Sequence, residues 1–192
     1  MIPPTQVPRL RNAAATRAAM LDSARRHFAR ESYENVGLRE IAGEAGVDPA
    51  LVARYFGNKE KLFKEAVRGD DEDIMQGVRR DGLAAHFVSL ILDDEEAVDK
   101  SAKIDRLLIL LRSASSPKAS QIIREAIDED ILGPVAAVLG GEHAEFRASL
   151  CLAVLMGTGI LRSAMAIDPL CRADEGLLRE RLTALFAAAL AS

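Results

Sequence analysis

The segment LREIAGEAGVDPALVARYF, residues 38–56, decides the fold of this chain. Its apolar spacing predicts two short helices joined by a tight turn. Gly46 lies where the chain must reverse, and glycine adopts positive φ there without steric cost. Asp48 is a good N-cap residue, and Pro49 suits the first turn of the second helix, where its missing N–H costs nothing. Residues 38–56 therefore predict a helix-turn-helix unit.

The second of these helices has an inward and an outward face. Val52 and Phe56 are four residues apart and point inward, and Ala42 on the first helix is small enough to let the two helices cross closely. The residues left on the outward side are Pro49, Ala50, Leu51, Ala53, Arg54 and Tyr55. The second helix of such a unit lies in the DNA major groove, so we interpret residues 49–55 as a recognition helix. The alternative is an ordinary helical corner without a DNA role.

Helices are also predicted on both sides of this unit. Over residues 16–31 the evidence is a set of apolar residues at helical spacing, namely Met20, Leu21, Ala24 and Phe28. After the unit, Gly57 ends the second helix and Asn58 begins another, with Lys59 in its first turn. A cation there opposes the helix dipole, whereas a phosphate group is attracted to a helix N-terminus. Lys59 is therefore a candidate for binding a DNA phosphate.

In this region the chain resembles the tetracycline-repressor (TetR) family of bacterial regulators. The resemblance covers the first third of the chain and is carried by Phe28, Leu38, Ile41, Ala42, Glu44, Ala45, Gly46, Val47, Val52, Tyr55, Phe56, Lys59, Leu62 and Phe63. It implies a homodimer that binds a double-stranded DNA operator and responds to a small effector. Two residues depart from the family pattern. Leu38 replaces a capping Thr, so Asn35 or a backbone group is expected to cap that helix, and Ala53 replaces a phosphate-binding Tyr, which leaves Tyr55 and Arg54 to make that contact.

The expected DNA-binding residues lie on the recognition helix and beside it. They are Arg17, Arg39, Asp48, Pro49, Ala50, Leu51, Arg54, Tyr55 and Lys59. Arg54 is the best single candidate for a base or phosphate contact, while the other cations and Tyr55 are expected to hold the backbone and set the register. Leu51 and Ala53 cannot hydrogen-bond a base, although both can pack on thymine methyl groups. A helical interaction module that no longer binds DNA is therefore the alternative function.

Charge is distributed unevenly along the chain. Residues 1–68 hold 12 Lys or Arg against 8 Asp or Glu, a balance of +4, and residues 69–192 hold 13 against 21, a balance of −8. A basic head on an acidic body is expected where one end of a protein meets phosphate. Residues 1–14 contain three prolines with Arg9 and Arg11 and are expected to form a flexible arm. That arm is either a tail without a role or a basic segment that contacts DNA.

The helical pattern continues to the end of the chain, and no alternating strand pattern is present. We therefore expect an all-α fold of about nine helices, with a three-helix DNA-binding head and a C-terminal helical bundle. The expected division is an arm at 1–14, a helix-turn-helix domain at 15–68, and a ligand-binding and dimerisation domain at 69–192. The acidic stretch at residues 69–73 is the predicted boundary.

The last two predicted helices are candidates for the dimer interface. They carry apolar and small residues at helical spacing: Leu150, Val154, Gly157, Leu161, Met165, Leu178, Leu182, Leu185, Phe186 and Ala189. Two such helices from each of two chains make a four-helix bundle about a two-fold axis. The alternatives are that both helices belong to the core of one chain, or that Gly157 and Gly159 open room for a ligand.

By resemblance, the middle helices enclose an effector cavity. The candidate lining residues are Phe87, Leu90, Leu107, Leu108, Leu111, Arg112, Leu155 and Thr158, and each of the apolar ones is also a candidate for plain core. Polar groups that could orient a ligand are few, namely His86, Arg112, Ser113 and Thr158. The sequence therefore predicts an apolar or amphipathic effector.

Other classes of protein receive little support. His27, His86 and His143 lie at spacings that do not suit metal binding, and Cys151 and Cys171 are expected to be reduced thiols. No catalytic constellation, cofactor motif or signal peptide is present. The longest apolar run, residues 148–160, is too short to cross a membrane, so a cytoplasmic location is expected. The predicted function is a ligand-released transcriptional repressor that binds an inverted-repeat operator as a homodimer.

Overall fold

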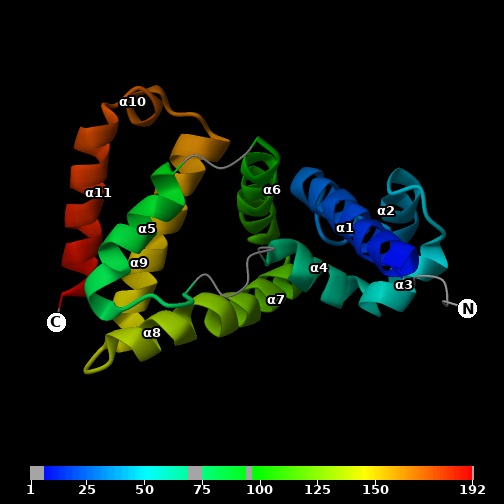
Figure 1. Cartoon of the computed structure of the whole chain (residues 1–192), viewed down its shortest axis with the longest axis horizontal. Helices are drawn as coiled ribbons and strands as arrows, with labels where there is room; N and C mark the ends of the chain where they lie inside the picture. The colour runs from blue at the N-terminus through cyan, green and yellow to red at the C-terminus, as the bar shows by residue number, and fades with distance from the viewer. Residues whose placement is uncertain (1–6, 69–74, 94–96, 192) are drawn as a thin grey trace, which may run out of the picture.

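The computed structural model describes residues 7–68, 75–93 and 97–191 of the 192-residue chain, and gives no side-chain placement for residues 7–12 and 97–99. The described residues are helical and contain no strand, which confirms the all-α prediction. Helices α1 to α4 lie at one end of the molecule, α9 and α11 lie at the other, and α6 and α7 lie between them (Figure 1).

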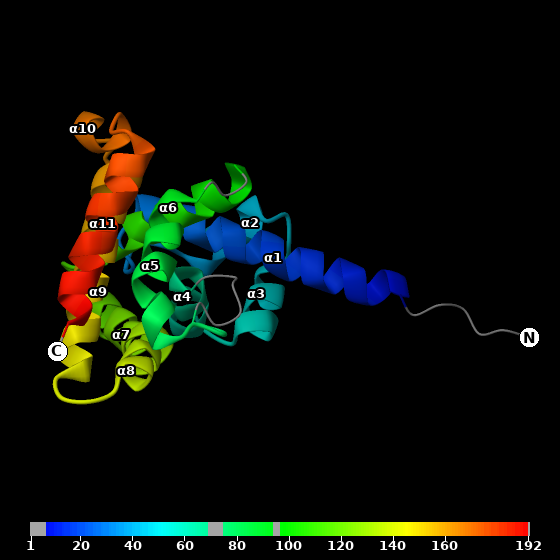
Figure 2. The same cartoon turned by 60° about the vertical axis from the view of Figure 1, so that its left-hand side comes forward.

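The head contains α1 (Val7–Arg30), α2 (Leu38–Glu44), α3 (Pro49–Phe56) and α4 (Lys59–Val67). Residues 7–14 belong to α1, so the structure has a helix over that range where a flexible arm was expected. Residues 1–6 lie outside the described part of the chain. The first turns of α1 extend beyond the other helices (Figure 2).

The predicted turn chemistry is present between α2 and α3. Gly46 has a φ of +66°, and the Asp48 side chain accepts a hydrogen bond from the Ala50 N–H at 2.7 Å. Asn58 caps α4 in the same manner, accepting from the Lys61 N–H at 2.9 Å. Asn35, one of the two groups expected to cap α2, does not cap it.

At the start of α2 a glycine occupies the N-cap position. Gly37 has no side-chain oxygen to offer, and its N–H donates to Glu40 Oε2 at 2.9 Å. This is the half of a capping box that a glycine can still provide. A glutamate within the first turn of the helix therefore provides the side-chain hydrogen bond at the start of α2.

The core of the head continues into the rest of the molecule. Phe28 and Phe63 meet edge to face with ring centroids 4.9 Å apart, and Ile41, Val52 and Phe56 are buried around them. The same apolar cluster includes Ile109 of α6 and Ala119, Ile122 and Ile123 of α7. Packing therefore joins the head to α6 and α7 although the chain passes through residues 69–74 between them.

The body contains the remaining helices, and a second apolar cluster forms its core. They are η1 (Arg80–Gly82), α5 (Leu83–Leu92), α6 (Ala97–Ser113), α7 (Pro117–Ile127), α8 (Gly133–Leu139), α9 (Ala144–Gly159), α10 (Asp168–Cys171) and α11 (Glu175–Leu190). Phe87 of α5 and Phe186 of α11 stack in this core at 5.2 Å between ring centroids. Cys151 is buried there as a free thiol, and Cys171 is free and exposed.

Two π-helical turns extend helices of the body. Asp128–Leu132 (η2) joins α7 to α8, and Ile160–Ala164 (η3) continues α9. Gly133 and Pro134 therefore follow a turn of i→i+5 geometry, with the Gly133 N–H donating to the Asp128 carbonyl. The wider turn accommodates a proline that would clash within an ordinary α-helix.

With η3 included, the α9 helix spans Ala144–Ala164, a length of 21 residues. An 18-residue window of it has a mean hydropathy of 1.5, which satisfies the length and composition of a membrane-crossing helix, and 22% of that window is buried. The apolar run at residues 148–160, which was expected to be too short to cross a membrane, lies within this longer helix. One face of the helix, including Cys151 and Leu155, packs within the core of the body.

Candidate DNA-binding face and effector cavity

The outward face of α3 is open to solvent. Pro49, Ala50, Ala53 and Arg54 are exposed, and Leu51 is partly exposed. On the other side of the helix, the inward residues Val52 and Phe56 are buried, as predicted. Arg39 on α2 is exposed as well. The Asp48 carboxylate is committed to the N-cap of α3, which gives this predicted contact residue a structural role.

Arg17 lies where α1, α3 and α4 meet. Its guanidinium pairs with the Glu65 carboxylate of α4, and its Cζ lies 4.9 Å from the centroid of the Phe56 ring. The Arg17 side chain remains 42% exposed, so it is anchored without being removed from solvent. Tyr55 is partly buried and packs against the core of the head.

Lys59 has structural contacts that its sequence position did not suggest. Its Nζ donates to the Glu34 carbonyl oxygen at 3.2 Å and lies 4.6 Å from the centroid of the Tyr33 ring. Partial burial is the main cause that lowers the pKa of Lys59 from its usual value. The cation at the start of α4 thus stabilises the α1–α2 connection through a hydrogen bond and a cation–π contact.

A polar cluster that sequence reasoning missed holds α2 against α1. The Glu44 carboxylate accepts from Arg26 Nε at 2.7 Å and from Ser23 Oγ at 3.2 Å, and His27 Nε2 lies 2.9 Å from it. The hydrogen bond from Arg26 is the largest cause that lowers the pKa of Glu44. Three α1 residues at helical spacing opposite an acidic residue of α2 are the signal that could have indicated it.

Between the head and the far end of the body lies a cavity of about 550 Å³. Its two long walls are single helix faces with the spacing i, i+3, i+4, i+7. The α6 wall presents Lys103, Arg106, Leu107 and Leu110, and the α9 wall presents Leu152, Leu155, Met156 and Gly159. The volume falls within the range of about 300–1,000 Å³ that is typical of small-molecule sites.

Residues of other elements line the rest of the cavity. Val67 and Arg68 come from the end of α4, and Leu90 and Ile91 come from the end of α5. Both π-helical turns contribute, through Glu129, Asp130 and Ile131 of η2 and Ser163 of η3. Such turns occur frequently at functional sites, which strengthens the interpretation of this cavity as a ligand site.

The structure places three of the eight expected lining residues on the cavity wall: Leu90, Leu107 and Leu155. Phe87 lies in the apolar core, Leu108 packs against the head core, and Leu111 is 47% exposed. Arg112 donates from Nε to the Ala29 carbonyl at 2.6 Å, and Thr158 lies one position before the lining residue Gly159. The prediction that these five residues line the cavity is therefore wrong.

The charged residues of the cavity were not anticipated from the sequence. Arg68, Lys103, Arg106, Glu129 and Asp130 line it, whereas the expected polar groups His86 and Ser113 do not. The i, i+3, i+4, i+7 series on α6 was the available signal, because it includes two cations followed by two leucines.

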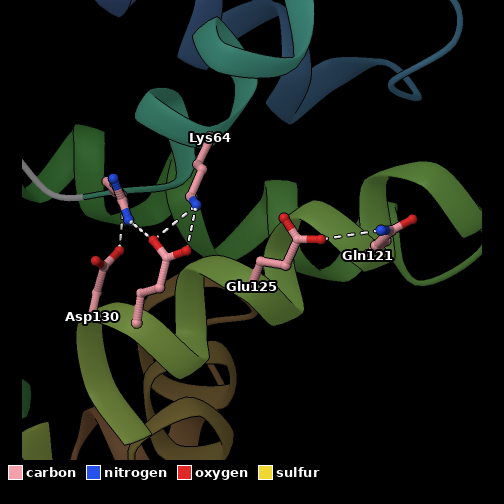
Figure 3. A network of polar contacts seen from close by, with 6 residues as sticks. Lys64, Gln121, Glu125 and Asp130 are labelled. Atoms are coloured by element: carbon pink, nitrogen blue, oxygen red, sulfur yellow. Dashed lines mark hydrogen bonds and ion pairs between the residues drawn. The ribbon is translucent and has the colours of Figure 1, made fainter. Parts of the chain in front are cut away.

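An ion-pair cluster links the end of α4 to η2. Glu129 pairs with Lys64 Nζ at 2.8 Å and with Arg68 Nη2 at 2.6 Å, and Asp130 pairs with Arg68 Nε at 2.6 Å (Figure 3). The hydrogen bond from Lys64 is the largest cause that lowers the pKa of Glu129. We call these four residues the α4–η2 cluster, and two of its members from η2 also line the cavity.

The helices at the far end present an apolar surface. Leu150 and Leu161 of the α9–η3 helix, Met165 just after it, and Leu185 of α11 are exposed, with Met165 57% and Leu185 52% accessible. Gly157 is exposed, while Val154 and Leu178 are partly buried. Phe146 and Leu177 are further exposed apolar residues that the sequence reasoning did not name.

Three residues predicted for the dimer interface are instead part of the core. Leu182, Phe186 and Ala189 face α5 and α9 within the body and are nearly inaccessible. Their spacing matched that of the exposed residues because α11 is apolar on both sides. Within α11, the predicted interface is therefore limited to the residues on the outward side of the helix.

Comparisons with known proteins agree with this architecture. A family model described as bacterial regulatory proteins of the tetR family matches residues 20–66, and one described as a tetracyclin repressor-like C-terminal domain matches residues 81–190. The regulator BetI of Agrobacterium fabrum is 39% identical over 69 residues, 36% of this chain and 32% of BetI. The chain spans between 31 and 60% of the length of the curated relatives it matches.

Solved structures share the fold over the whole length. NalD, the secondary repressor of the MexAB-OprM multidrug efflux pump in Pseudomonas aeruginosa, matches with a TM-score of 0.65 at 18% identity, over 92% of this chain and 97% of NalD. A transcriptional regulator of Saccharomonospora viridis in complex with choline matches with a TM-score of 0.56 at 19% identity, over 91% and 96% of the two chains. Because a family model covers more than half of the sequence, this chain belongs to the TetR family of bacterial regulatory proteins.

Proposed function

We propose that the protein is a sequence-specific DNA-binding transcriptional repressor, acting in the cytoplasm as a homodimer and released from an inverted-repeat operator by a small effector. The observation that carries this proposal is the open face of α3, with Arg54 and Arg39 exposed above buried Val52 and Phe56. Membership in a family of regulators rather than enzymes agrees with it.

Residues 15–68 are proposed to read the operator. Arg54 is proposed to contact a base or phosphate, and Leu51 is proposed to pack on a thymine methyl group. Arg17, Arg39, Tyr55 and Lys59 are proposed to contact phosphates, and Pro49 and Ala50 to let the helix approach the groove closely. The Asp48 carboxylate contributes by fixing the start of α3.

Residues 69–192 are proposed to dimerise and bind the effector. A second copy of the chain covers the exposed side of α9, η3 and α11, because a two-fold axis brings the same apolar patch of each chain together. A dimer also supplies the second recognition helix that selective binding requires. This interface comprises Leu150, Val154, Gly157, Leu161, Met165, Leu178 and Leu185.

Release is proposed to act through the contacts between α4 and the body. The cavity is bounded by Val67 and Arg68, the last residues described before the gap at 69–74, and by Glu129 and Asp130 of the α4–η2 cluster. A ligand in the cavity touches the residues that hold the end of α4. The position of the head therefore depends on whether the cavity is occupied.

The test is selection of bound fragments from the source organism's DNA with the purified chain at two salt concentrations. Recovery of a common inverted repeat is the expected result, and Arg54→Ala should abolish the enrichment. Arg124→Ala, which removes an exposed cation of α7, is the matched control and should retain it. Binding without any shared motif would instead favour the interaction module, in which Leu51 and Ala53 face a protein.

A further inference from the structure

The charge of the cavity is divided between two ends. At the η2 end, the carboxylates of Glu129 and Asp130 are both paired with Arg68, and Glu129 also pairs with Lys64. A ligand cation placed there would have to displace two protein cations. The η2 end is therefore electrostatically satisfied and offers a cationic ligand little attraction.

At the α6 end the charges are cationic. Lys103 and Arg106 lie three residues apart on the same face of α6 and both border the cavity. Lys103 Nζ donates to the carbonyl oxygen of Leu90 at the end of α5, which fixes the ammonium at the cavity wall. Arg106 brings a planar guanidinium with several donors, a geometry that suits a carboxylate or phosphate group.

The rest of the cavity is aliphatic. Beyond Arg106, the α6 wall continues with Leu107 and Leu110, and the facing α9 wall presents Leu152, Leu155 and Met156. These side chains offer dispersion contacts and no hydrogen bonds, so they suit a hydrocarbon body. A headgroup site and an apolar body site thus follow one another along α6.

The same lining argues against a quaternary ammonium ligand. Such cations are bound by aromatic faces, and none of the described residues that line this cavity is aromatic. The structural neighbour in complex with choline is 19% identical to this chain, a level at which the fold is shared without the site. The two proteins are therefore expected to differ in the charge of their ligands.

We propose that the cavity binds an amphipathic organic anion, with its acidic headgroup at Lys103 and Arg106 and its hydrocarbon body between Leu107, Leu152 and Met156. The inference rests on the proposed function only in taking this cavity as the effector site. The ligand class itself follows from two features of the lining, which are the two cationic side chains on the α6 wall and the aliphatic side chains that follow them.

The experiment compares three probes of equal chain length, namely decanoate, decanol and decyltrimethylammonium, with the two ionic probes below their micelle concentrations and decanol below its solubility limit. Binding to the full-length protein is measured as displacement of the neutral fluorescent probe N-phenyl-1-naphthylamine, without DNA. Decanoate should bind at least tenfold more tightly than decyltrimethylammonium, because a charge-assisted hydrogen bond to the headgroup is formed only by the anion.

Variants locate the headgroup. Lys103→Met combined with Arg106→Met should reduce decanoate binding about tenfold while leaving decanol within twofold of its original affinity. Arg124→Met, which removes an exposed cation elsewhere in the body, is the matched control and should change neither. Retained decanol binding by the double variant shows that its cavity is folded.

Two results would overturn the proposal. One is equal or tighter binding of the cation by the unmodified protein, and the other is a double variant that keeps its preference for decanoate over decanol. Neither result bears on DNA binding, which is measured separately by fragment selection. Failure to select an operator, in turn, leaves the ligand measurement intact, so the two proposals fail independently.

Discussion

At the residue scale, the buried cation Arg147 supports the ends of two helices. Its guanidinium donates to the carbonyl of Gly140 after α8 and to the carbonyl of Leu190 at the end of α11, and the residue is 4% exposed. Arg147→Met keeps the apolar stem and leaves both partly buried carbonyls without these donors. The free energy of unfolding should fall by about 2–4 kcal/mol.

Chemical denaturation at neutral pH measures that change. Arg172→Met is the control, because Arg172 pairs on the surface with Asp168 through a side chain that is 80% exposed. Surface pairs contribute little, so the control should unfold at nearly the same denaturant concentration as the original protein. Equal destabilisation by both substitutions would show that Arg147 has no special structural role.

Lys59 and Leu51 are expected to affect DNA binding in different ways. Lys59→Ala removes a proposed phosphate contact, so affinity should fall equally for all sequences and the salt slope should decrease by about one. Because Lys59 also contacts Tyr33 and Glu34, stability should fall by about 0.5–1 kcal/mol. Leu51→Gln should instead alter which sequence is preferred. An unchanged salt slope in Lys59→Ala would contradict the placement of the head on DNA.

The sequence identified the residues of the turn because their chemistry is local. Gly46, Asp48 and Asn58 act on backbone groups within three residues of themselves, so pattern and spacing suffice. The contacts of Lys59 were missed because its partners lie 25 and 26 residues earlier, in a loop whose path no periodicity encodes. The Glu44 cluster joins two helices, and it was missed because its α1 partners Arg26 and Ser23 lie 18 and 21 residues earlier.

At the scale of elements, the α4–η2 cluster should make the joint between head and body sensitive to acid. The pKa of Glu129 is lowered by Lys64 and Arg68, so its contribution is present above the unfolded value near 4.5 and is lost as pH falls through the folded pKa. Glu129→Gln should therefore lower the melting temperature at pH 7, and that difference should vanish in acid. Glu180→Gln on α11 is the control.

Thermal unfolding of both variants between pH 7 and pH 3 checks this expectation. The wild-type protein and Glu129→Gln should converge at low pH, whereas the Glu180→Gln protein should follow the wild type throughout. A constant difference between the wild type and Glu129→Gln across the range would show that protonation of Glu129 does not weaken the cluster.

Gly159 offers a way to fill the cavity from α9. A Cβ added there would lie 3.6 Å from Leu107 Cδ1, an ordinary contact distance, so the backbone tolerates a side chain at this position. Gly159→Leu should occupy the volume between α6 and α9 and reduce decanoate binding more than tenfold. Operator binding should remain and should no longer respond to ligand. Gly82→Leu, at a position outside the cavity where an added Cβ meets nothing within 4 Å, is the control.

The sequence predicted the helices of the body, but it did not predict which side of each helix faces the cavity. Leu107 and Leu155 were correctly predicted to line the cavity. Leu108, Leu111 and Thr158 were also predicted to line it, but each lies one or more positions along the helix from a residue that does. The prediction chose Arg112 and Thr158 as the polar residues of the wall and left out Lys103 and Arg106, which share a helix face with Leu107 and Leu110. The π-helical turns add a residue to a turn, and a period of 3.6 does not reveal them.

At the scale of the whole molecule, the order of helices followed from the sequence and the packing of the head against the body did not. The composition change at residues 69–73 suggested two separate domains. In the structure, Ile109 and Ile122 of the body complete the core around Phe28 and Phe63 of the head. Contacts between segments far apart in sequence are set by three-dimensional packing, which one sequence does not encode in its periodicity. The head is therefore expected to unfold together with α6 and α7.

The exposed apolar side of α9, η3 and α11 leads to the last prediction. Leu150 and Leu185 are 39% and 52% accessible in the single chain and lie on the two helices proposed to pair across the two-fold axis. Leu150→Glu combined with Leu185→Glu places four carboxylates in the symmetric interface, where burying unpaired charges is costly. The double variant should sediment as a monomer and bind the operator at least tenfold more weakly, because two recognition helices are no longer linked.

Leu111→Glu is the matched control for that variant. Leu111 is 47% exposed on α6, away from the proposed interface, so the same substitution should leave both the dimer and operator affinity unchanged. Thermal unfolding distinguishes loss of the dimer from loss of the fold, since a monomer that retains its core around Phe87 and Phe186 still melts cooperatively. A double variant that remains dimeric would show that the two chains meet through another surface, and the apolar side of α11 would then need a different partner.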